Sequence, residues 1–340
     1  MTCRRSIGLL RSLALAAGIA AILGAPGARA ADDQLVVYSA NESTLDNLVF
    51  EAFKKETGIQ VQPVEAGSGV LVKRIAAEKD RPQGDILWGV SRSLMQTNAD
   101  YFAPYRSKNA DAVVPEFRDP QDRWLGTNVH LLVILANTKE VAPADLPKSW
   151  SDLLDPKWKG KIAFTDPANS GSAYTNTTLL VDLWGGGDKG WAEVTKLYAN
   201  MKVLNKSSLV FSGIGEGEYP LGISLEYAGY VWASNGAPVK VIYPSDGSAM
   251  QMEGVAIVKG GPNLEPAKKF VDFVSRKDTR EMILAHTFRR PARGDLDLEH
   301  LPGGLPSLGK VHVVNYDEKK WTDARPETMQ KIQDIVQKTR

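Results

Sequence analysis

The stretch DPANSGSAYT, residues 166–175, places amide, hydroxyl and glycine residues side by side just ahead of a predicted helix. Asn169 and Ser170 can cap that helix, because their side chains accept hydrogen bonds from free N–H groups of the first turn. The stretch can also hold an anion, since free N–H groups and hydroxyls at a helix start converge on a phosphate, phosphonate or carboxylate. Ser170, Gly171 and Ser172 are therefore candidates for both roles, and the stretch alone leaves both open.

Patterns that indicate catalysis are missing from the sequence. The histidines stand apart and form neither a zinc nor a metalloprotease pattern. They are His130, His286, His300 and His312. A hydrolase that uses Ser68 or Ser172 as nucleophile needs a base, and no histidine lies near either serine in sequence. We therefore expect a binding protein without a cofactor, and an exported hydrolase is the alternative from another class.

The first thirty residues have the pattern of a signal peptide. Arg4 and Arg5 form a basic region, residues 13–23 are apolar, and Ala28-Arg29-Ala30 is a cleavage site of small residues. We expect export to the periplasm, by a general secretory or a twin-arginine route. Cys3 is the only cysteine and would leave with this segment, so the exported chain would carry no disulfide and no thiol.

The exported chain would be weakly acidic. The first thirty residues hold four arginines and no acidic residue, so 37 basic and 40 acidic residues remain, a net charge of −3. This balance argues against nucleic acid and against an anionic membrane as partners. No later apolar stretch reaches the roughly 20 residues of a membrane span. About 310 residues are enough for two domains, and we expect a soluble monomer.

The first part of the exported chain alternates strands and helices. Apolar runs predict strands at residues 35–38, 59–64 and 85–89, and the spacing of apolar residues predicts helices at 45–53 and 70–76. This alternation indicates a parallel sheet with helices on both faces.

Polar and aromatic residues follow each of these three strands. In open sheets of this kind, ligands bind beyond the carboxyl ends of the strands, where the loops meet. We therefore expect a binding site at this edge. Its candidate residues are Ser39, Asn41, Ser68, Gly69, Trp88 and Ser91.

Two apolar runs, residues 131–136 and 253–258, are predicted to cross between two lobes. The second lobe is expected to repeat the α/β pattern, with elements near residues 150–154, 161–164, 190–201, 206–208, 217–224, 225–238 and 239–243 and a tail helix at 326–338. Residues 31–130 and 255–305 would form lobe 1. Residues 131–254 and 306–340 would form lobe 2.

Five segments between about residue 34 and residue 295 follow one another in an order that a known family shares. They are VVYSANESTLDNLVFEAFKKETGIQVQ, GSGVLVKRIAAEKDRPQGDILWG, WSDLLDPKWKGKIAFTDPANSGSAY, GAPVKVIYPSDGSA and RRPARGD. Through them the chain resembles the periplasmic solute-binding proteins of ABC importers, in the subgroup that binds ferric ion, phosphonates, phosphoglycerate and sugar phosphates. The resemblance implies a two-lobed type II periplasmic binding fold, lobes that close over a small ligand, and delivery to an ABC permease at the inner membrane.

The resemblance also implies which positions contact the ligand. Family members place such groups in the loop after the first strand, in the glycine-rich loop and at several points of the second lobe. The matching residues here are Ser39, Asn41, Glu42, Ser68, Gly69, Ser170, Gly171, Ser172, Ser207, Glu226, Tyr227 and Tyr230.

Three kinds of ligand fit these residues. The first is a phosphonate or phosphorylated metabolite, whose anion would bind Ser170–Ser172 and whose amine or hydroxyl tail would bind Glu42 or Glu226. The second is ferric iron, held by Glu42, Tyr227 and Tyr230, since phenolate oxygens suit this ion. The iron binders of the subgroup have adjacent tyrosines, whereas these two are three positions apart. The third is a polyamine or another amine, bound between Glu42, Glu226 and aromatic side chains.

Overall fold

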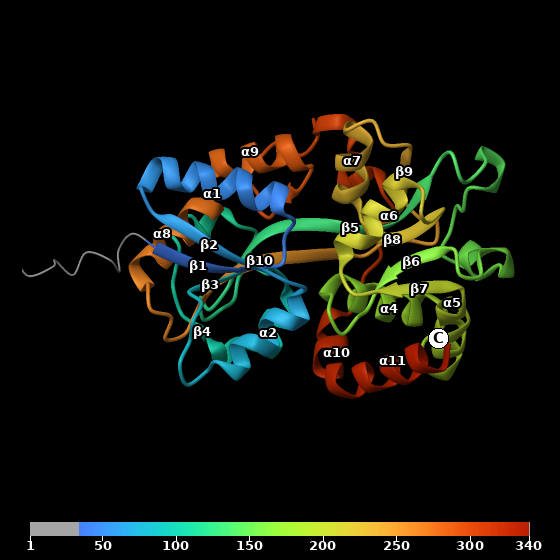
Figure 1. Ribbon diagram of the computed structural model, residues 1–340, viewed down its shortest axis with the longest axis horizontal. Helices are drawn as coiled ribbons and strands as arrows, with labels where there is room; N and C mark the ends of the chain where they lie inside the picture. Colours follow the sequence, from blue (N-terminus) through green and yellow to red (C-terminus); the bar gives the residue numbers. More distant parts are fainter. Residues whose placement is uncertain (1–33, 340) are drawn as a thin grey trace, which may run out of the picture.

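The computed structural model describes residues 34–339, in which two α/β lobes lie side by side (Figure 1). The predicted signal peptide and Cys3 lie outside the described residues. Two long strands, β5 (Leu125–Asn137) and β10 (Met250–Val258), run from one lobe into the other. In the described part of the chain, no helix has the length and apolar character to cross a membrane.

The first lobe has a sheet in which β1 lies between β2 and β3. β1 pairs in parallel with β2 and β3, as the alternating pattern predicts, and α1 and α2 connect these strands. Its elements are β1 (Gln34–Ser39), α1 (Ser43–Thr57), β2 (Gln60–Glu65), α2 (Ser68–Ala77), β3 (Ile86–Ser91), α3 (Arg92–Thr97), β4 (Phe102–Ala103), α8 (Leu264–Ser275), α9 (Lys277–Thr287) and β11 (Arg290–Pro291).

The boundaries of α1 follow from its sequence. Leu45, Val49 and Phe53 recur at helical spacing and are buried against the sheet. The helix ends at Gly58, whose φ of 75° is the left-handed conformation that glycine adopts without steric cost. The turn at Gly58 leads into β2. The start of α1 lies at the edge of the sheet that faces the second lobe.

The second lobe has its own sheet, in which β6 pairs in parallel with β7 and β8. The predicted element at 150–154 is a short 3-10 helix, Ser151–Leu154, and the other predicted elements of this lobe are present. They are β6 (Ile162–Thr165), α4 (Gly171–Leu183), α5 (Gly187–Asn200), β7 (Met201–Leu204), α6 (Ser207–Glu216), β8 (Leu221–Leu225), α7 (Glu226–Ser234), β9 (Val239–Ile242), α10 (Glu318–Asp323) and α11 (Arg325–Thr339).

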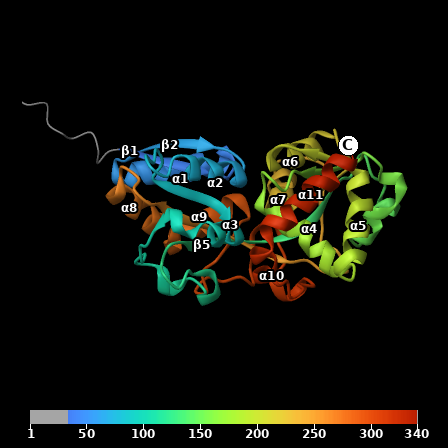
Figure 2. The ribbon, with the colours of Figure 1, turned by 90° about the horizontal axis from the view of Figure 1, so that it is seen from below.

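β5 and β10 join the two sheets. Along the path β2-β1-β3-β10-β5-β8-β6-β7, β10 is antiparallel to both β3 and β5. Each lobe has a separate apolar core, and the division falls within β5, where Val129 belongs to the first core and Leu131 to the second. Figure 2 shows the lobes from below, one on each side of this connection. The predicted residue ranges of the two lobes stay a prediction.

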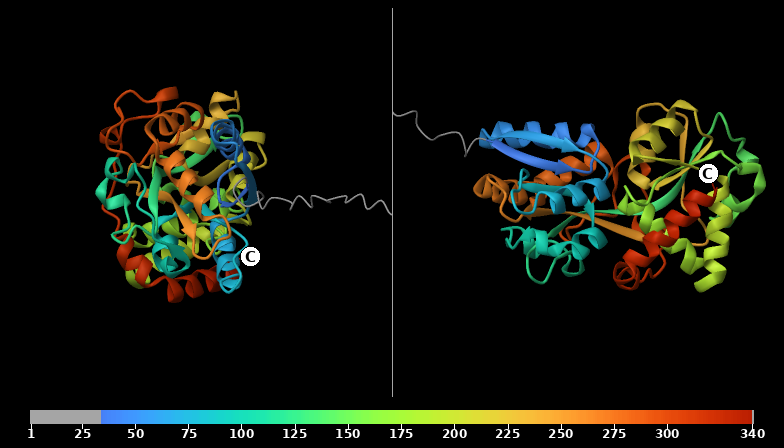
Figure 3. Two further views of the ribbon diagram at one scale, coloured as in Figure 1. Left: turned by 90° about the vertical axis from the view of Figure 1, so that its left-hand side faces the viewer. Right: turned by 60° about the horizontal axis from the view of Figure 1, so that its bottom comes forward.

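The chain end connects the lobes a second time. Helices α10 and α11 cover the lower side of the second lobe (Figure 3). The side chain of Arg92, at the start of α3 in the first lobe, forms an ion pair with Glu318 of α10, in which its Nε lies 2.7 Å from the carboxylate. The tail helix therefore belongs to the second lobe and contacts the first beside the opening between them.

Candidate functional site

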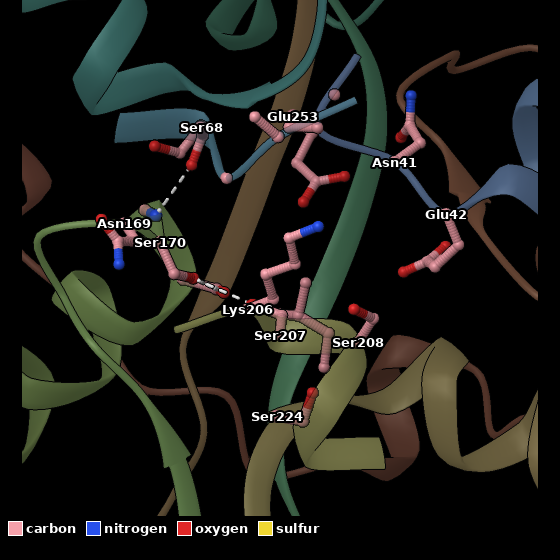
Figure 4. Close-up of a pocket in the computed structure, with 18 of the residues that line it drawn as sticks. Asn41, Glu42, Ser68, Asn169, Ser170, Lys206, Ser207, Ser208, Ser224 and Glu253 are labelled. Carbon is pink, nitrogen blue, oxygen red and sulfur yellow. Dashed lines mark hydrogen bonds between the residues drawn. The ribbon is translucent and has the colours of Figure 1, made fainter. Parts of the chain in front are cut away.

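A polar cleft of about 170 Å³ lies between the two lobes (Figure 4). The first lobe contributes the loop after β1 and the start of α2. The second lobe contributes the starts of α4 and α6 and the end of β8. Of the predicted site residues, the structure brings together Asn41, Glu42, Ser68, Ser170, Gly171, Ser172, Ser207 and Tyr227, and Ser91 lines the cleft as well.

The hydroxyls at one end of this cleft form a linked cluster. Ser170 caps α4 by accepting a hydrogen bond from the Ala173 N–H at 3.3 Å. Its Oγ also lies 2.9 Å from Ser172 Oγ and 3.2 Å from Ser207 Oγ. The cap predicted for the SGS stretch is therefore present, and it does not exclude ligand binding, because all three serines line the cleft.

Three helices begin at this end of the cleft. α2, α4 and α6 start at Ser68, Gly171 and Ser207, and the start of a helix carries a partial positive charge. Lys206 precedes α6, and Figure 4 shows its side chain extending into the space between the lobes. Neutral hydroxyls, helix starts and one ammonium group together make this end suited to an oxyanion.

The opposite end of the cleft is a network of charged groups built around Arg289. This arginine is 1% exposed and lies 2.5 Å from Glu42 and 3.2 Å from Glu253. Its guanidinium also stacks 3.6 Å from the centre of the Tyr227 ring, and the Tyr227 hydroxyl donates to Glu42. His130 Nε2 lies 3.1 Å from Glu253. Two carboxylates of the cleft wall are thus fixed by one buried arginine.

The protonation states at this end follow from these contacts. Burial, which is the largest effect, raises the pKa of Tyr227 well above its ordinary value, so the phenol stays neutral at pH 7. Burial would also raise the pKa of Glu253, but His130 and Arg289 outweigh it and leave that pKa below its usual value. Glu253 is therefore ionised, and it can accept hydrogen bonds from a ligand.

Ser39 lies beneath the cleft and does not line it. It is fully buried at the end of β1, where its hydroxyl donates to Asp46 at 2.8 Å and accepts from Asn41 Nδ2 at 3.1 Å. Burial raises the pKa of Asp46 to about 7. The prediction of Ser39 as a ligand contact is corrected accordingly, because its hydroxyl is used to orient Asn41.

Trp88 and Gly69 also take other places than predicted. Trp88 is fully buried in the first core, with its ring 5.9 Å from Phe50 and 5.5 Å from Phe270, so it does not reach the cleft. Gly69 is buried where the lobes touch, and its N–H lies 3.3 Å from the carbonyl of Asn169. It contributes to the contact between lobes instead of to the lining of the cleft.

Glu226 is absent from the cleft lining as well. It is fully buried, and Arg290 Nε donates to its Oε1 at 2.7 Å and Arg290 Nη2 to its Oε2 at 3.0 Å. The Leu131 N–H and the Tyr243 hydroxyl donate to the same carboxylate. Each oxygen of this carboxylate thus accepts two hydrogen bonds and has none left for a ligand. We therefore interpret Glu226 as a structural residue near the connection between the lobes.

We expect Glu226→Gln to lower the stability of the protein and to leave ligand affinity unchanged. Gln keeps the size and can still accept hydrogen bonds, but it leaves the charge of Arg290 without a counter-ion, at a cost of about 2 kcal/mol. Chemical denaturation and calorimetric titration of the same variant check both parts. Wild-type stability together with weakened ligand binding would restore the predicted role of Glu226 in the cleft.

The residues predicted for ferric iron are only partly brought together. Glu42 and Tyr227 are hydrogen-bonded, but the Tyr230 hydroxyl lies 3.5 Å from the Gly304 carbonyl, and its ring packs against Phe288. Within residues 34–339 there is no cluster of three or more His, Cys, Asp or Glu side chains that could hold a metal ion. The predicted iron set therefore lacks its third member.

Several residues of the cleft were not predicted from the sequence. Lys206 and Ser208 flank the predicted Ser207, so a basic residue before a helix start was an available signal. Glu253 lies on a strand predicted only as a crossing, and Arg289 lies in the segment RRPARGD, which served only to identify the resemblance. No local pattern indicates that these two side chains meet.

Residues 85–320 match the family described as bacterial extracellular solute-binding proteins. A protein of Salmonella paratyphi A named for periplasmic binding of 2-aminoethylphosphonate is 27% identical over 85% of this chain and 88% of its own. The Fe(3+)-binding periplasmic protein of Serratia marcescens is 25% identical over 79% and 81%.

A solved structure has the same fold. The periplasmic binding protein AfuA of Actinobacillus pleuropneumoniae, with exogenous fructose-6-phosphate bound, superposes with a TM-score of 0.83 at 27% identity, over 89% of this chain and 98% of that protein. The predicted two-lobed type II periplasmic binding fold is therefore confirmed.

Proposed function

The chain belongs to the bacterial extracellular solute-binding proteins, and on that premise we propose that it captures a small organic phosphate or phosphonate for an ABC importer. It is a binding protein and not an enzyme. Its partners would be the ligand and a permease at the inner membrane, which it would meet in the periplasm as a monomer.

The observation that carries this proposal is the cluster of hydroxyls and helix starts at one end of the cleft. Ser170, Ser172 and Ser207 lie within hydrogen-bonding distance of one another, and Lys206 adds one positive charge. Donors in a partly enclosed cleft interact with an anion more strongly than they would in water. A phosphoryl or phosphonyl group has three oxygens that can accept from such donors.

The other end of the cleft supports a ligand with a polar tail. Asn41, Glu42 and Glu253 offer acceptors, so an amino group or a sugar hydroxyl can donate to them. The relatives named for 2-aminoethylphosphonate and solved with fructose-6-phosphate have ligands of this kind. These relatives support an organic phosphate or phosphonate as the ligand.

Ferric iron is the second candidate, favoured by the contact of Glu42 with Tyr227 and by the Serratia relative. Two observations argue against iron. Tyr227 is a neutral phenol that donates a hydrogen bond to Glu42, and the Tyr230 ring packs against Phe288. A polyamine is less well supported, because Glu42 already pairs with Arg289 and the buried Glu226 with Arg290.

A thermal-midpoint screen tests this proposal with 2-aminoethylphosphonate, fructose-6-phosphate, ferric citrate and spermidine as probes. A ligand at 100 times its dissociation constant stabilises the folded protein by about 2.7 kcal/mol, and we expect this only with the phosphorus compounds. A shift with ferric citrate alone would contradict the proposal.

Ser172→Ala then tests the anion site. Loss of a hydrogen bond to a charged group should weaken binding of the phosphorus compound by about 1.5–3 kcal/mol in a calorimetric titration. Ser234→Ala makes the same change at an exposed position of α7 and should leave affinity unchanged. Equal affinities for both variants would reduce the SGS stretch to a helix cap.

A further inference from the structure

A second hollow of about 240 Å³ adjoins the polar cleft. Glu42, Ser208, Phe211 and Tyr227 line both hollows, so the two lie directly beside each other. The second one extends between the start of α1 in the first lobe and helices α6 and α7 in the second. We call it the apolar groove, after its residues Leu45, Phe211, Ala228, Val231 and Trp232.

The apolar groove offers little to a polar or charged group. Among the residues that line it, the ionisable ones are Glu42 and Tyr227, which hydrogen-bond to each other at the boundary with the cleft. Its other polar side chains carry neutral hydroxyls, and that of Thr287 already donates to the Ile283 carbonyl at 2.7 Å. The remaining hydroxyls are those of Thr44, Ser208 and Ser212. The walls therefore favour hydrocarbon.

The shape of the apolar groove favours part of a small molecule over a protein surface. Leu45, Phe211 and Ala228 line it and are at most 6% exposed, so a flat partner would contact little of them. Leu209 at the rim is 46% exposed. An apolar cavity of about 150 Å³ is enough to admit benzene, so this groove has room for a group the size of a ring.

We infer that the ligand carries an apolar ring or branched alkyl body, which enters the apolar groove while its anion occupies the serine end of the cleft. The preferred class is thus a phosphate or phosphonate that carries an aryl or alkyl group in addition to its polar tail. This inference rests on the proposed function, since it needs an anion in the cleft. The inference adds that a ligand with an apolar body binds more tightly than the same ligand without one, because residues of both lobes contact that body.

Calorimetric titration of the full chain with methylphosphonate and with benzylphosphonate tests the inference. These probes share the anion and differ by one phenyl ring. We expect the benzyl compound to bind the wild-type protein at least about ten-fold more tightly, as hydrocarbon in an apolar site does. Equal or weaker binding of the benzyl compound would overturn the inference. Failure of both probes to bind would instead contradict the proposed anion site.

Ser212→Phe tests whether the tighter binding of benzylphosphonate depends on the apolar groove. Ser212 is half-buried on α6 and lines the apolar groove but not the polar cleft. A phenyl group there should fill the groove, remove the advantage of benzylphosphonate and leave methylphosphonate binding unchanged. Ser234→Phe, an exposed change on α7, should keep the advantage. If Ser212→Phe does not fold, Val231→Ser removes part of the wall and should reduce the advantage, and an undiminished preference would overturn the inference.

Discussion

Gly69→Ala should lower ligand affinity about 100-fold or more while the free protein folds normally. A Cβ at this position would lie 2.2 Å from the carbonyl oxygen of Ala168, across the contact between lobes. That oxygen belongs to the backbone and cannot move aside as a flexible side chain does. The lobes should therefore be unable to close over the ligand. Calorimetric titration measures the loss.

The ligand-free variant provides an internal check on this prediction. Gly69 lies in the first turn of α2, where alanine is favoured over glycine by roughly 0.5–1 kcal/mol, so the melting temperature without ligand should not fall. Gly309→Ala is the matched control, since no atom lies within 4 Å of a Cβ there. Wild-type affinity in Gly69→Ala would show that the observed contact between lobes is not needed for binding.

Arg289→Met should destabilise the protein by about 3–5 kcal/mol, the cost of leaving buried charge without its partner. Arg289 is the shared partner of Glu42 and Glu253, and it is nearly fully buried. Met fills similar space but carries no charge, so Glu42 loses its counter-ion and Glu253 keeps only its contact with His130. Chemical denaturation of the ligand-free protein measures the effect.

The control for this change is an arginine in an exposed ion pair. Arg276 also contacts two carboxylates, Glu56 and Asp278, but its side chain is 38% exposed. Arg276→Met should cost at most about 1 kcal/mol, as surface pairs usually do. Adding Glu42→Gln and Glu253→Gln to Arg289→Met should recover part of the lost stability. Equal losses for the two arginine variants would contradict the electrostatic explanation.

The fold was largely predictable because its signals are local. The apolar run at 35–38 and the helical spacing at 45–53 lie within single elements, and β1 and α1 follow them. The SGS stretch was recognised for the same reason, since a cap acts on N–H groups two or three residues away. Helix α9, Lys277–Thr287, was not predicted, because polar residues interrupt its apolar spacing.

The site was less predictable because its contacts are distant in sequence. Glu226 was expected to bind ligand, but its partner Arg290 lies 64 positions later, and no local pattern indicates that pair. Trp88 was expected at the end of a strand, but β3 continues to Ser91 and the Trp88 side chain is buried in the core. Arg289 reaches Glu42 over 247 positions. In each case the tertiary fold decides whether a polar or aromatic residue faces the cleft.

Equilibrium dialysis followed by elemental analysis tests the central claim most directly. The protein is dialysed against a mixture of 2-aminoethylphosphonate, fructose-6-phosphate and ferric citrate, and phosphorus and iron are measured on both sides of the membrane. A cleft that holds one small organic phosphate or phosphonate predicts an excess of about one phosphorus atom per chain and no excess of iron. An excess of iron without phosphorus would contradict the account.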